Sequence, residues 1–341
     1  MQLYDFKEIE ERVILIGVQT EQDEDVAASL DELEELASTA GAVTVGKVIQ
    51  NREAVHPGTY IGKGKIEEVA ALLAAYDANG IICDDELSPA QMNNLERELD
   101  CKVMDRTLLI LDIFAGRATT SEGKIQVELA QLRYRSARLV GLRESLSRLG
   151  GGIGTRGPGE KKLETDRRLI RTRISALKAE LAQVEKHREL IRGKRSRGNL
   201  KTAAIVGYTN AGKSTLLNTL TGAGILAEDK LFATLDPTTR VLELKEGQQI
   251  LLTDTVGFIR KLPHHLVEAF KSTLEEAKYA DYIIHVVDVS NPQAELQMHT
   301  VYETLRELGA TGKKIITLLN KQDQAEGAQI RDLQADYTVK C

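Results

Sequence analysis

Residues 207–214 read GYTNAGKS and match the phosphate-binding pattern G-x-x-x-x-G-K-S/T in full. The apolar residues 202–206 (TAAIV) predict a strand before this loop, and residues 213–221 predict a helix after it. In such a unit, successive backbone N–H groups and the positive end of the helix surround phosphate oxygens. Lys213 is expected to reach the β and γ oxygens, and the Ser214 hydroxyl is expected to ligate Mg²⁺. The pattern therefore predicts an α/β domain of the P-loop type.

Two segments further along carry groups that a nucleotide-dependent switch needs. Residues 232–236 read FATLD and begin 18 positions after Ser214. Their Thr234 is a candidate ligand of Mg²⁺ and of the γ-phosphate, with an ordinary strand threonine as the alternative interpretation. Residues 254–257 read DTVG and follow an apolar stretch that predicts a strand. Their acidic residue can hold the metal through water, and Gly257 leaves room for its N–H to meet the γ-phosphate.

A fourth motif is suited to recognising the base. Residues 320–323 read NKQD and end the apolar stretch 314–319, which predicts a strand. The Asp323 carboxylate can accept hydrogen bonds from guanine N1–H and N2–H₂, a donor pair that adenine lacks. Four motifs in this order at strand ends predict binding of GTP and GDP.

The predicted site follows from these four motifs. The predicted GTP-binding residues are Gly207, Tyr208, Thr209, Asn210, Ala211, Gly212, Lys213, Ser214, Phe232, Ala233, Thr234, Leu235, Asp236, Asp254, Thr255, Val256, Gly257, Asn320, Lys321, Gln322 and Asp323. Ser214 and Thr234 are the predicted metal ligands. Lys213 is the predicted catalytic group, since hydrolysis by water in line needs charge stabilisation and no covalent residue.

The bulk composition narrows the class of protein. The chain has 341 residues, 42% of them hydrophobic and 28% charged, which is ordinary for a globular protein of two or three domains. No stretch approaches the roughly 18 apolar residues of a membrane span, and an acidic start argues against an export signal. Three distant cysteines fit a reducing cytosol. We expect a cytoplasmic monomer, with peripheral membrane association as an alternative location.

The first 115 or so residues alternate short apolar runs with helical patterns. This alternation predicts a small α/β domain with a largely parallel sheet. A Ser-Pro pair opens one of the helices with a good N-cap and first position. The expected strands are residues 13–18, 43–49, 81–84 and 103–105, and the expected helices are residues 23–39, 65–76, 88–99 and 107–114.

The middle of the chain differs sharply in charge and pattern. Residues 117–201 hold 22 Lys/Arg and 9 Asp/Glu, a net charge of +13 in a chain whose net charge is −6. Two heptad-like stripes flank the glycine-rich stretch 150–159 (GGGIGTRGPG) and predict an antiparallel helical hairpin with a mobile tip. The basic charge favours contact with RNA phosphates, although solvated helix faces are the plainer alternative. We expect an N-terminal subdomain at 1–117, this hairpin at 118–192, a linker at 193–200 and the P-loop domain at 201–341.

With these residues in place, the chain resembles the HflX family of GTPases, relatives of the Obg group. The likeness covers nearly the whole chain and rests on GYTNAGKS, LFATLDPTTR, DTVGFIRKLPHHLVEAFKSTLEE, NKQD and LGGGIGTRGPGEKKLETDRR. The last stretch, residues 149–168, is far more specific than a P-loop. The resemblance implies binding to the large ribosomal subunit and its rRNA through the hairpin, whose tip would approach the peptidyl-transferase region. It also implies separation of stalled ribosomes into subunits, notably under heat stress.

Three features qualify this resemblance. The family runs on through another guanine-contacting loop after residues 337–341, so we expect a fragment or a naturally short chain with weaker GTP affinity. Phe258 stands where many GTPases carry a water-orienting Gln, which indicates either simple core packing or slow turnover that a partner accelerates. Asn210 is either a ligand of K⁺ beside the phosphates or a residue that caps the loop.

The sequence therefore predicts a ribosome-associated GTPase that hydrolyses GTP slowly alone and faster on the ribosome. A GTPase of ribosomal subunit assembly and a GTP-bound, non-catalytic RNA-binding scaffold are the alternatives. A further alternative is ATP use by the N-terminal domain, but the sequence shows no second nucleotide-binding motif that would support it.

Overall fold

The computed structural model describes residues 10–21, 25–149, 158–197, 200–222, 230–262, 271–325 and 330–341. The chain divides into two compact units. The first comprises Met1–Ile113 with Gln131–Thr172, and the second comprises Phe114–Ala130 with Arg173–Cys341. Within the described residues we find no helix that combines the length and the apolar composition that a membrane crossing requires.

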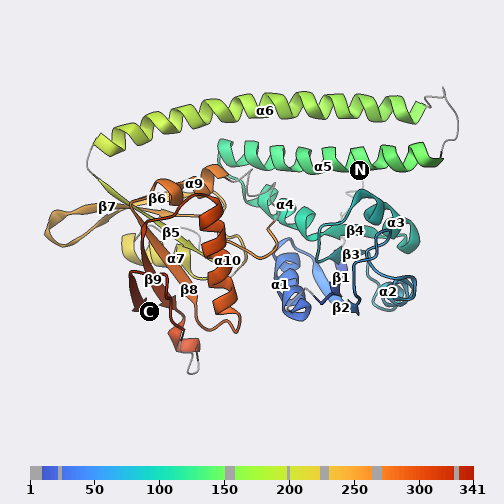
Figure 1. Ribbon diagram of the computed structural model, residues 1–341, viewed down its shortest axis with the longest axis horizontal. Coiled ribbons are helices and arrows are strands. Elements are labelled where there is room, and N and C mark those ends of the chain that lie inside the picture. The colour runs from blue at the N-terminus through green and yellow to red at the C-terminus, as the bar shows by residue number, and fades with distance from the viewer. Residues whose placement is uncertain are drawn as a thin grey trace, which may run out of the picture. The chain divides into compact units, whose positions relative to one another are not determined.

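The first unit is built on a four-stranded parallel sheet with strand order β2-β1-β3-β4 (Figure 1). Its central strand β1 buries six consecutive residues, as a strand covered on both faces should. The expectation of a small α/β domain with a parallel sheet is confirmed. The elements are β1 (Arg12–Gln19), α1 (Val26–Thr39), β2 (Val43–Asn51), α2 (Lys63–Ala75), β3 (Gly80–Cys83), α3 (Pro89–Leu99), β4 (Lys102–Asp105) and α4 (Arg106–Arg117).

Local sequence accounts for where these helices begin. Asp25 caps α1 by accepting a hydrogen bond from the Ala28 N–H. Ser88 and Gln91 form a capping box at the start of α3, with Pro89 at the first helical position. The Ser-Pro signal in the sequence thus fixes this helix start.

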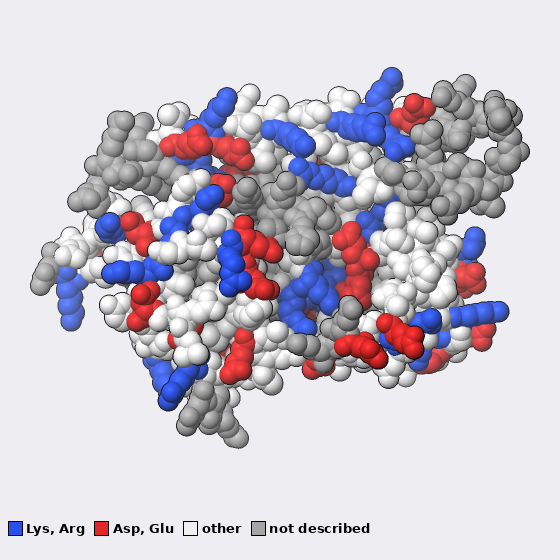
Figure 2. All heavy atoms as spheres, viewed as in Figure 1, with Lys and Arg blue, Asp and Glu red and all other residues white. Residues whose placement is uncertain are grey.

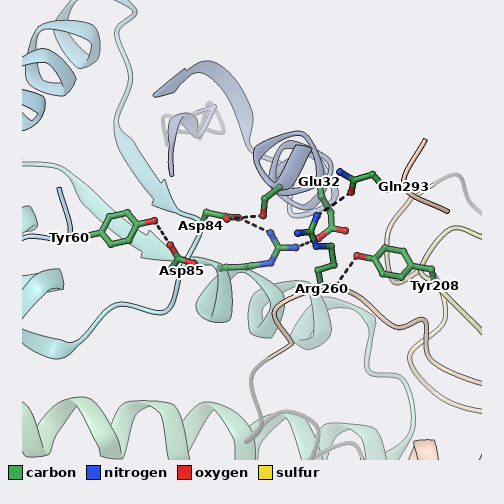
Figure 3. Close-up of polar contacts among 9 residues, drawn as sticks. Glu32, Tyr60, Asp84, Asp85, Tyr208, Arg260 and Gln293 are labelled. Carbon is green, nitrogen blue, oxygen red and sulfur yellow. Dashed lines mark hydrogen bonds and ion pairs between the residues drawn. The ribbon is translucent and has the colours of Figure 1, made fainter. Parts of the chain in front are cut away.

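The two carboxylates that directly follow β3, the buried Asp84 and the partly buried Asp85, are paired inside the first unit. Asp84 accepts hydrogen bonds from Arg106 Nη1 at 2.8 Å and from Ser29 Oγ at 2.7 Å. Asp85 accepts one from the Tyr60 hydroxyl at 2.6 Å (Figure 3). These pairs compensate the cost of burying charge, so the cluster serves the fold of this unit.

The second unit carries a six-stranded sheet with the order β10-β9-β8-β5-β7-β6, in which β6 alone runs antiparallel. The P-loop strand β5 lies between β8 and β7, so its end is central in the sheet. The elements are β5 (Lys201–Gly207), α7 (Lys213–Thr221), β6 (Thr238–Glu243), η1 (Lys245–Gly247), β7 (Gln249–Asp254), α9 (Lys271–Tyr279), β8 (Tyr282–Asp288), α10 (Ala294–Glu307), β9 (Lys314–Asn320), η2 (Gln322–Gln324) and β10 (Tyr337–Lys340).

Two long helices, α5 (Ser121–Leu149) and α6 (Pro158–Arg197), run side by side (Figure 1). Ion pairs join them: Arg173 Nε lies 2.7 Å from Glu128 Oε1, and Arg188 pairs with Glu122. Leu129 and Leu177, from the two expected apolar stripes, are buried.

The structure places the ends of these helices differently from the sequence boundaries. α6 runs through Arg197, five residues into the segment expected to be a linker, and it begins at Pro158, inside the expected tip. A continuous run of residues with good helix propensity outweighs the single Gly193 there. Residues 150–157 of the tip lie outside the described residues, and the domain boundaries stay a prediction.

Candidate nucleotide-binding site

The P-loop packs so closely against its neighbours that two of its glycines cannot be replaced without strain. A Cβ on Gly207 would lie 2.3 Å from the Val286 carbonyl oxygen of β8. Gly212 has a φ of +98°, and a Cβ there would lie 2.3 Å from Asn320 Nδ2. That Nδ2 donates to the Ala211 carbonyl at 2.9 Å. The phosphate loop is thereby tied to the NKQD segment, 109 positions away in the sequence.

Three of the four predicted motifs surround one pocket at the start of α7. From the predicted set, its lining residues are Thr209, Asn210, Gly212, Lys213, Ser214, Phe232, Ala233, Thr234, Thr255 and Gly257. Thr215 and Lys230 also line it, although the sequence analysis did not select them. Thr215 directly follows the P-loop serine, and Lys230 is a cation shortly before FATLD. Their closeness to the motifs in the sequence is the signal that could have identified them.

Lys213 lines this pocket and is buried, at 6% exposure. Its Nζ donates to the Tyr208 carbonyl at 2.6 Å. Burial lowers the pKa of Lys213 to about 8, because the charged ammonium loses its hydration, although Asp254 opposes the shift. An ammonium held in this poorly solvated place can compensate phosphate charge strongly.

Three oxygen-bearing side chains converge at the first turn of α7. Ser214 Oγ lies 2.7 Å from Asp254 Oδ2 and 2.8 Å from Thr234 Oγ1. Burial raises the pKa of Asp254, against the opposing effect of Lys213 and the two hydroxyls. Asp254 Oδ1 is buried with no hydrogen-bond partner among the described residues. Hydroxyl and carboxylate oxygens are the ligands that Mg²⁺ prefers, so this group fits a magnesium site.

The DTVG segment is fastened directly to the P-loop. Thr209 N–H donates to the Phe258 carbonyl at 2.7 Å, and Phe258 N–H donates to the Gly207 carbonyl at 3.1 Å. A Cβ on Gly257 would lie 2.6 Å from Thr209 Cα, so this approach needs a glycine. The Phe258 side chain is 1% exposed and packs in the core. This packing matches the simpler of the two interpretations of Phe258 given by the sequence.

Arg260 and Tyr208 form a second link between these segments. The Arg260 N–H donates to the Tyr208 hydroxyl at 2.8 Å, and Arg260 Nη1 donates to Gln293 Oε1 at 3.2 Å (Figure 3). The Tyr208 side chain is thus buried, at 5% exposure, with its hydroxyl engaged by the segment that follows DTVG. Sequence spacing gave no signal for this contact across 52 positions.

The NKQD residues lie at the end of β9. Lys321 has a φ of +60°, and its Nζ pairs with Asp288 Oδ2 at 2.7 Å, at the end of β8. Gln322 and Asp323 belong to the short helix η2, and Asp323 is exposed. These residues do not line the phosphate pocket, as expected for groups that would contact a base instead.

Besides the NKQD residues, seven predicted residues do not line the pocket: Gly207, Tyr208, Ala211, Leu235, Asp236, Asp254 and Val256. Leu235 and Val256 are buried, at 2% and 5% exposure. Asp236 instead accepts hydrogen bonds from Thr119 and Thr120, just before α5. Its carboxylate is thus engaged by the chain itself, and the sequence offered no sign of this partner.

Comparisons with known proteins agree with this geometry. Residues 27–115 match the family described as GTP-binding GTPase N-terminal, and residues 117–195 match GTP-binding GTPase Middle Region. Residues 202–321 match the family described as 50S ribosome-binding GTPase. The chain is 72% identical over 340 residues to the GTPase HflX of Lacrimispora saccharolytica, covering 99% of this chain and 80% of that protein.

The chain belongs to the HflX family of GTPases. It is also 46% identical over 329 residues to the GTPase HflX of Escherichia coli K12, covering 96% of this chain and 77% of that protein. The resemblance predicted from the motifs is confirmed, and with it the activity: the chain binds GTP and hydrolyses it to GDP and phosphate. GTPases with this P-loop domain generally use Mg²⁺, which the group of Ser214, Thr234 and Asp254 fits.

Solved structures support the fold assignment of this HflX family member. The chain is similar to a GTP-binding protein from Sulfolobus solfataricus in complex with GDP, at a TM-score of 0.50 and 28% identity, covering 93% of this chain and 85% of that one. A crystal structure of an SsGBP and GDP complex gives a TM-score of 0.53 at 29% identity, covering 93% of this chain and 84% of that one.

Proposed function

We propose that this GTPase binds the large ribosomal subunit and splits or rescues stalled ribosomes, notably under stress. The observation that carries the proposal is the match of residues 202–321 to the family described as 50S ribosome-binding GTPase. The chain would act in the cytoplasm as a monomer, and the ribosome would accelerate its hydrolysis of GTP.

The nucleotide site would work as a switch under this proposal. Lys213 and the P-loop N–H groups would hold the β and γ phosphates, and Asp323 would recognise guanine. Ser214 and Thr234 would ligate Mg²⁺, with Asp254 acting through water. Mg²⁺ supplies positive charge that compensates the charge developing on the phosphates. Contacts to the γ-phosphate would order Thr234 and Gly257, and hydrolysis would release them.

Asn210 would further hold K⁺ beside the phosphates. It lines the phosphate pocket, and its φ of +59° is a left-handed backbone conformation, which belongs to neither a helix nor a strand. Turnover compared in KCl and NaCl tests the idea. A rate at least severalfold higher in KCl supports it, and equal rates contradict it.

The basic segment supports RNA as the partner. Residues 117–201 hold 22 Lys/Arg against 9 Asp/Glu. Arg167, Arg168 and Arg171 line one pocket on α6 together with Glu164. Figure 2 shows Lys and Arg side chains recurring along the band that α6 occupies in Figure 1, with acidic ones between them. Such cations neutralise phosphates without reading sequence, which suits a structured rRNA surface.

A splitting assay on intact ribosomes tests this function. Purified chain with a slowly hydrolysed GTP analogue should convert intact ribosomes to subunits, while the chain with GDP should not. Binding to free large subunits should weaken steeply as salt rises, because counterions compete for the same phosphates.

A matched pair of charge reversals adds specificity to the assay. Arg168→Glu on α6 should weaken ribosome binding about tenfold or more. Arg97→Glu, an exposed arginine on α3 in the same unit, should leave it unchanged. Binding of free large subunits without splitting would favour the assembly GTPase instead. Absence of any ribosome binding would contradict both functions.

A further inference from the structure

The predicted GTP contact Asp236 instead makes a dense set of hydrogen bonds with the start of α5. Asp236 Oδ2 accepts from Thr119 N–H at 2.9 Å, Thr119 Oγ1 at 2.7 Å and Thr120 N–H at 2.9 Å. Asp236 Oδ1 accepts from Thr120 Oγ1 at 2.6 Å. These residues are 116 or 117 positions apart in the sequence. One carboxylate therefore gathers two hydroxyls and two amides of another segment.

The same contact also builds the beginning of the helix. Thr120 Oγ1 accepts from the Gly123 N–H at 2.9 Å, which is how an N-cap residue satisfies the first turn. The Asp236 carboxylate thus lies at the N-terminal end of α5, where the helix dipole favours a negative charge. Moving Asp236 would remove an anion and a hydroxyl acceptor from this helix end.

The Phe232 side of the loop is anchored to the same stretch of chain. The rings of Phe232 and Phe114 make an edge-to-face contact with centroids 4.7 Å apart. Phe232 N–H donates to Thr209 Oγ1 of the P-loop at 2.8 Å. Phe232 and Asp236 flank Thr234, each two positions away, so both sides of the switch threonine are attached to residues 114–120.

We propose that Asp236 is a positioning residue for GTP hydrolysis, which holds Thr234 beside Ser214 by clasping Thr119 and Thr120 at the start of α5. The clasp, meaning the four hydrogen bonds from Thr119 and Thr120 to Asp236, is formed in a structure where Thr234 Oγ1 lies 2.8 Å from Ser214 Oγ. A loop fixed at both sides of Thr234 holds that hydroxyl in one place, so less conformational entropy is lost when the nucleotide binds. By linkage, a nucleotide that favours this position of Thr234 also stabilises the clasp.

The inference deepens the GTPase function of the site and needs no ribosome for its test. Amide exchange of residues 119–124 in the full chain should be about tenfold slower with Mg²⁺ and a GTP analogue than with Mg²⁺ and GDP. In Asp236→Ala this difference should vanish. The kcat should fall about tenfold with little change in KM, because a positioning role is exerted on the chemical step.

Two further variants separate positioning from folding. A Cβ on Gly123 would lie 2.4 Å from Asp236 Oδ1, so Gly123→Ala should displace the carboxylate while favouring the helix itself. It should reproduce the loss of nucleotide-dependent exchange and the fall in kcat. Thr119→Ser, which keeps the hydroxyl, should behave as the unaltered chain does.

Matched controls come from the same unit. Gly116→Ala on α4 meets nothing within 4 Å and should change neither exchange nor kcat. Asp281→Ala removes a similar carboxylate, which accepts from Thr202 N–H at 2.9 Å at the opposite end of β5, and should also leave both unchanged.

The outcomes distinguish failure of the clasp from failure of the nucleotide-binding site. If the unaltered chain binds the GTP analogue but its amide exchange at residues 119–124 does not depend on the nucleotide, the clasp is wrong and the GTPase function is unaffected. Persistence of the exchange difference in Asp236→Ala would overturn the clasp as well. A chain that binds no guanine nucleotide would overturn the site itself.

Discussion

Thr234 Oγ1 lies 2.8 Å from Ser214 Oγ, although 20 positions separate these residues in the chain. The contact places a hydroxyl from the FATLD segment at the first turn of the P-loop helix. Asp254 Oδ2 lies 2.7 Å from the same Ser214 oxygen. Three different segments thus supply the oxygen atoms that a divalent cation would need beside the β and γ phosphates.

Removal of the Thr234 hydroxyl should affect hydrolysis more than GDP binding. Thr234→Ala should lower kcat about 100-fold, because a contact made to the γ-phosphate side stabilises the transition state. GDP affinity should change less than about threefold, because GDP lacks the γ-phosphate. Phosphate release and fluorescent-GDP titration at several Mg²⁺ concentrations check this. Thr219→Ala, an exposed threonine late in α7, is the control. Equal losses of GTP and GDP affinity would contradict the role.

Gly257→Ala should disable the switch because no space exists for the methyl group. The added carbon would lie 2.6 Å from Thr209 Cα and 2.9 Å from Lys213 Nζ, and the first of these is backbone. We expect kcat to fall at least about tenfold as the DTVG turn moves off the P-loop. The matched substitution Gly116→Ala should be neutral or stabilising. Normal turnover by Gly257→Ala would show that the turn can relax without cost.

Base specificity should depend on the Asp323 carboxylate. In Asp323→Asn, one of the two acceptors for the guanine donors becomes an NH₂ group, which can instead donate to the O2 of xanthine. Guanine nucleotide affinity should fall about 100-fold or more, and xanthosine triphosphate should become the better substrate. Competition titrations with GTP, ATP and xanthosine triphosphate measure this. Gln324→Glu, in the same short helix η2, is a control that leaves the carboxylate at position 323 in place. Unchanged discrimination in Asp323→Asn would mean that another group reads the base.

The sequence predicted those structural features that depend on residues close together along the chain. The P-loop strand and α7 lie where GYTNAGKS and its flanks placed them, because glycine requirements and apolar runs are local properties. The parallel sheet of the first unit followed likewise from alternating apolar runs. The Asp236 contacts with Thr119 and Thr120 could not be predicted, since they depend on how α5 meets the loop in space. The pairing of Lys321 with Asp288 is of the same kind, because it joins the ends of adjacent strands.

The pH dependence of stability should have a contribution from Asp332. The hydroxyls of Tyr302 and Thr317 donate to Asp332 Oδ2, and the Gln334 N–H donates to Oδ1 at 3.0 Å. Burial alone would raise the pKa of this carboxyl, but these hydrogen bonds, together with the neighbouring His285 ring, whose Nδ1 lies 3.7 Å from Asp332 Oδ2, outweigh it and hold the pKa below its usual range. A depressed pKa in the folded state stabilises the fold above the unfolded value of about 3.9. This contribution is lost as the pH falls through the folded pKa.

Asp332→Asn should therefore destabilise the second unit by about 1–3 kcal/mol at pH 7, where the carboxylate is charged. The difference from the unaltered chain should shrink as the pH falls below about 4, because the unfolded chain then takes up a proton at this carboxyl that the folded chain does not yet bind. Amide exchange of β8 and β9 at pH 7, and urea unfolding followed from pH 7 to pH 3, measure the two limits. Glu307→Gln, an exposed carboxylate at the end of α10, should show no such trend. A difference that stays constant down to pH 3 would mean that the amide disrupts packing rather than charge.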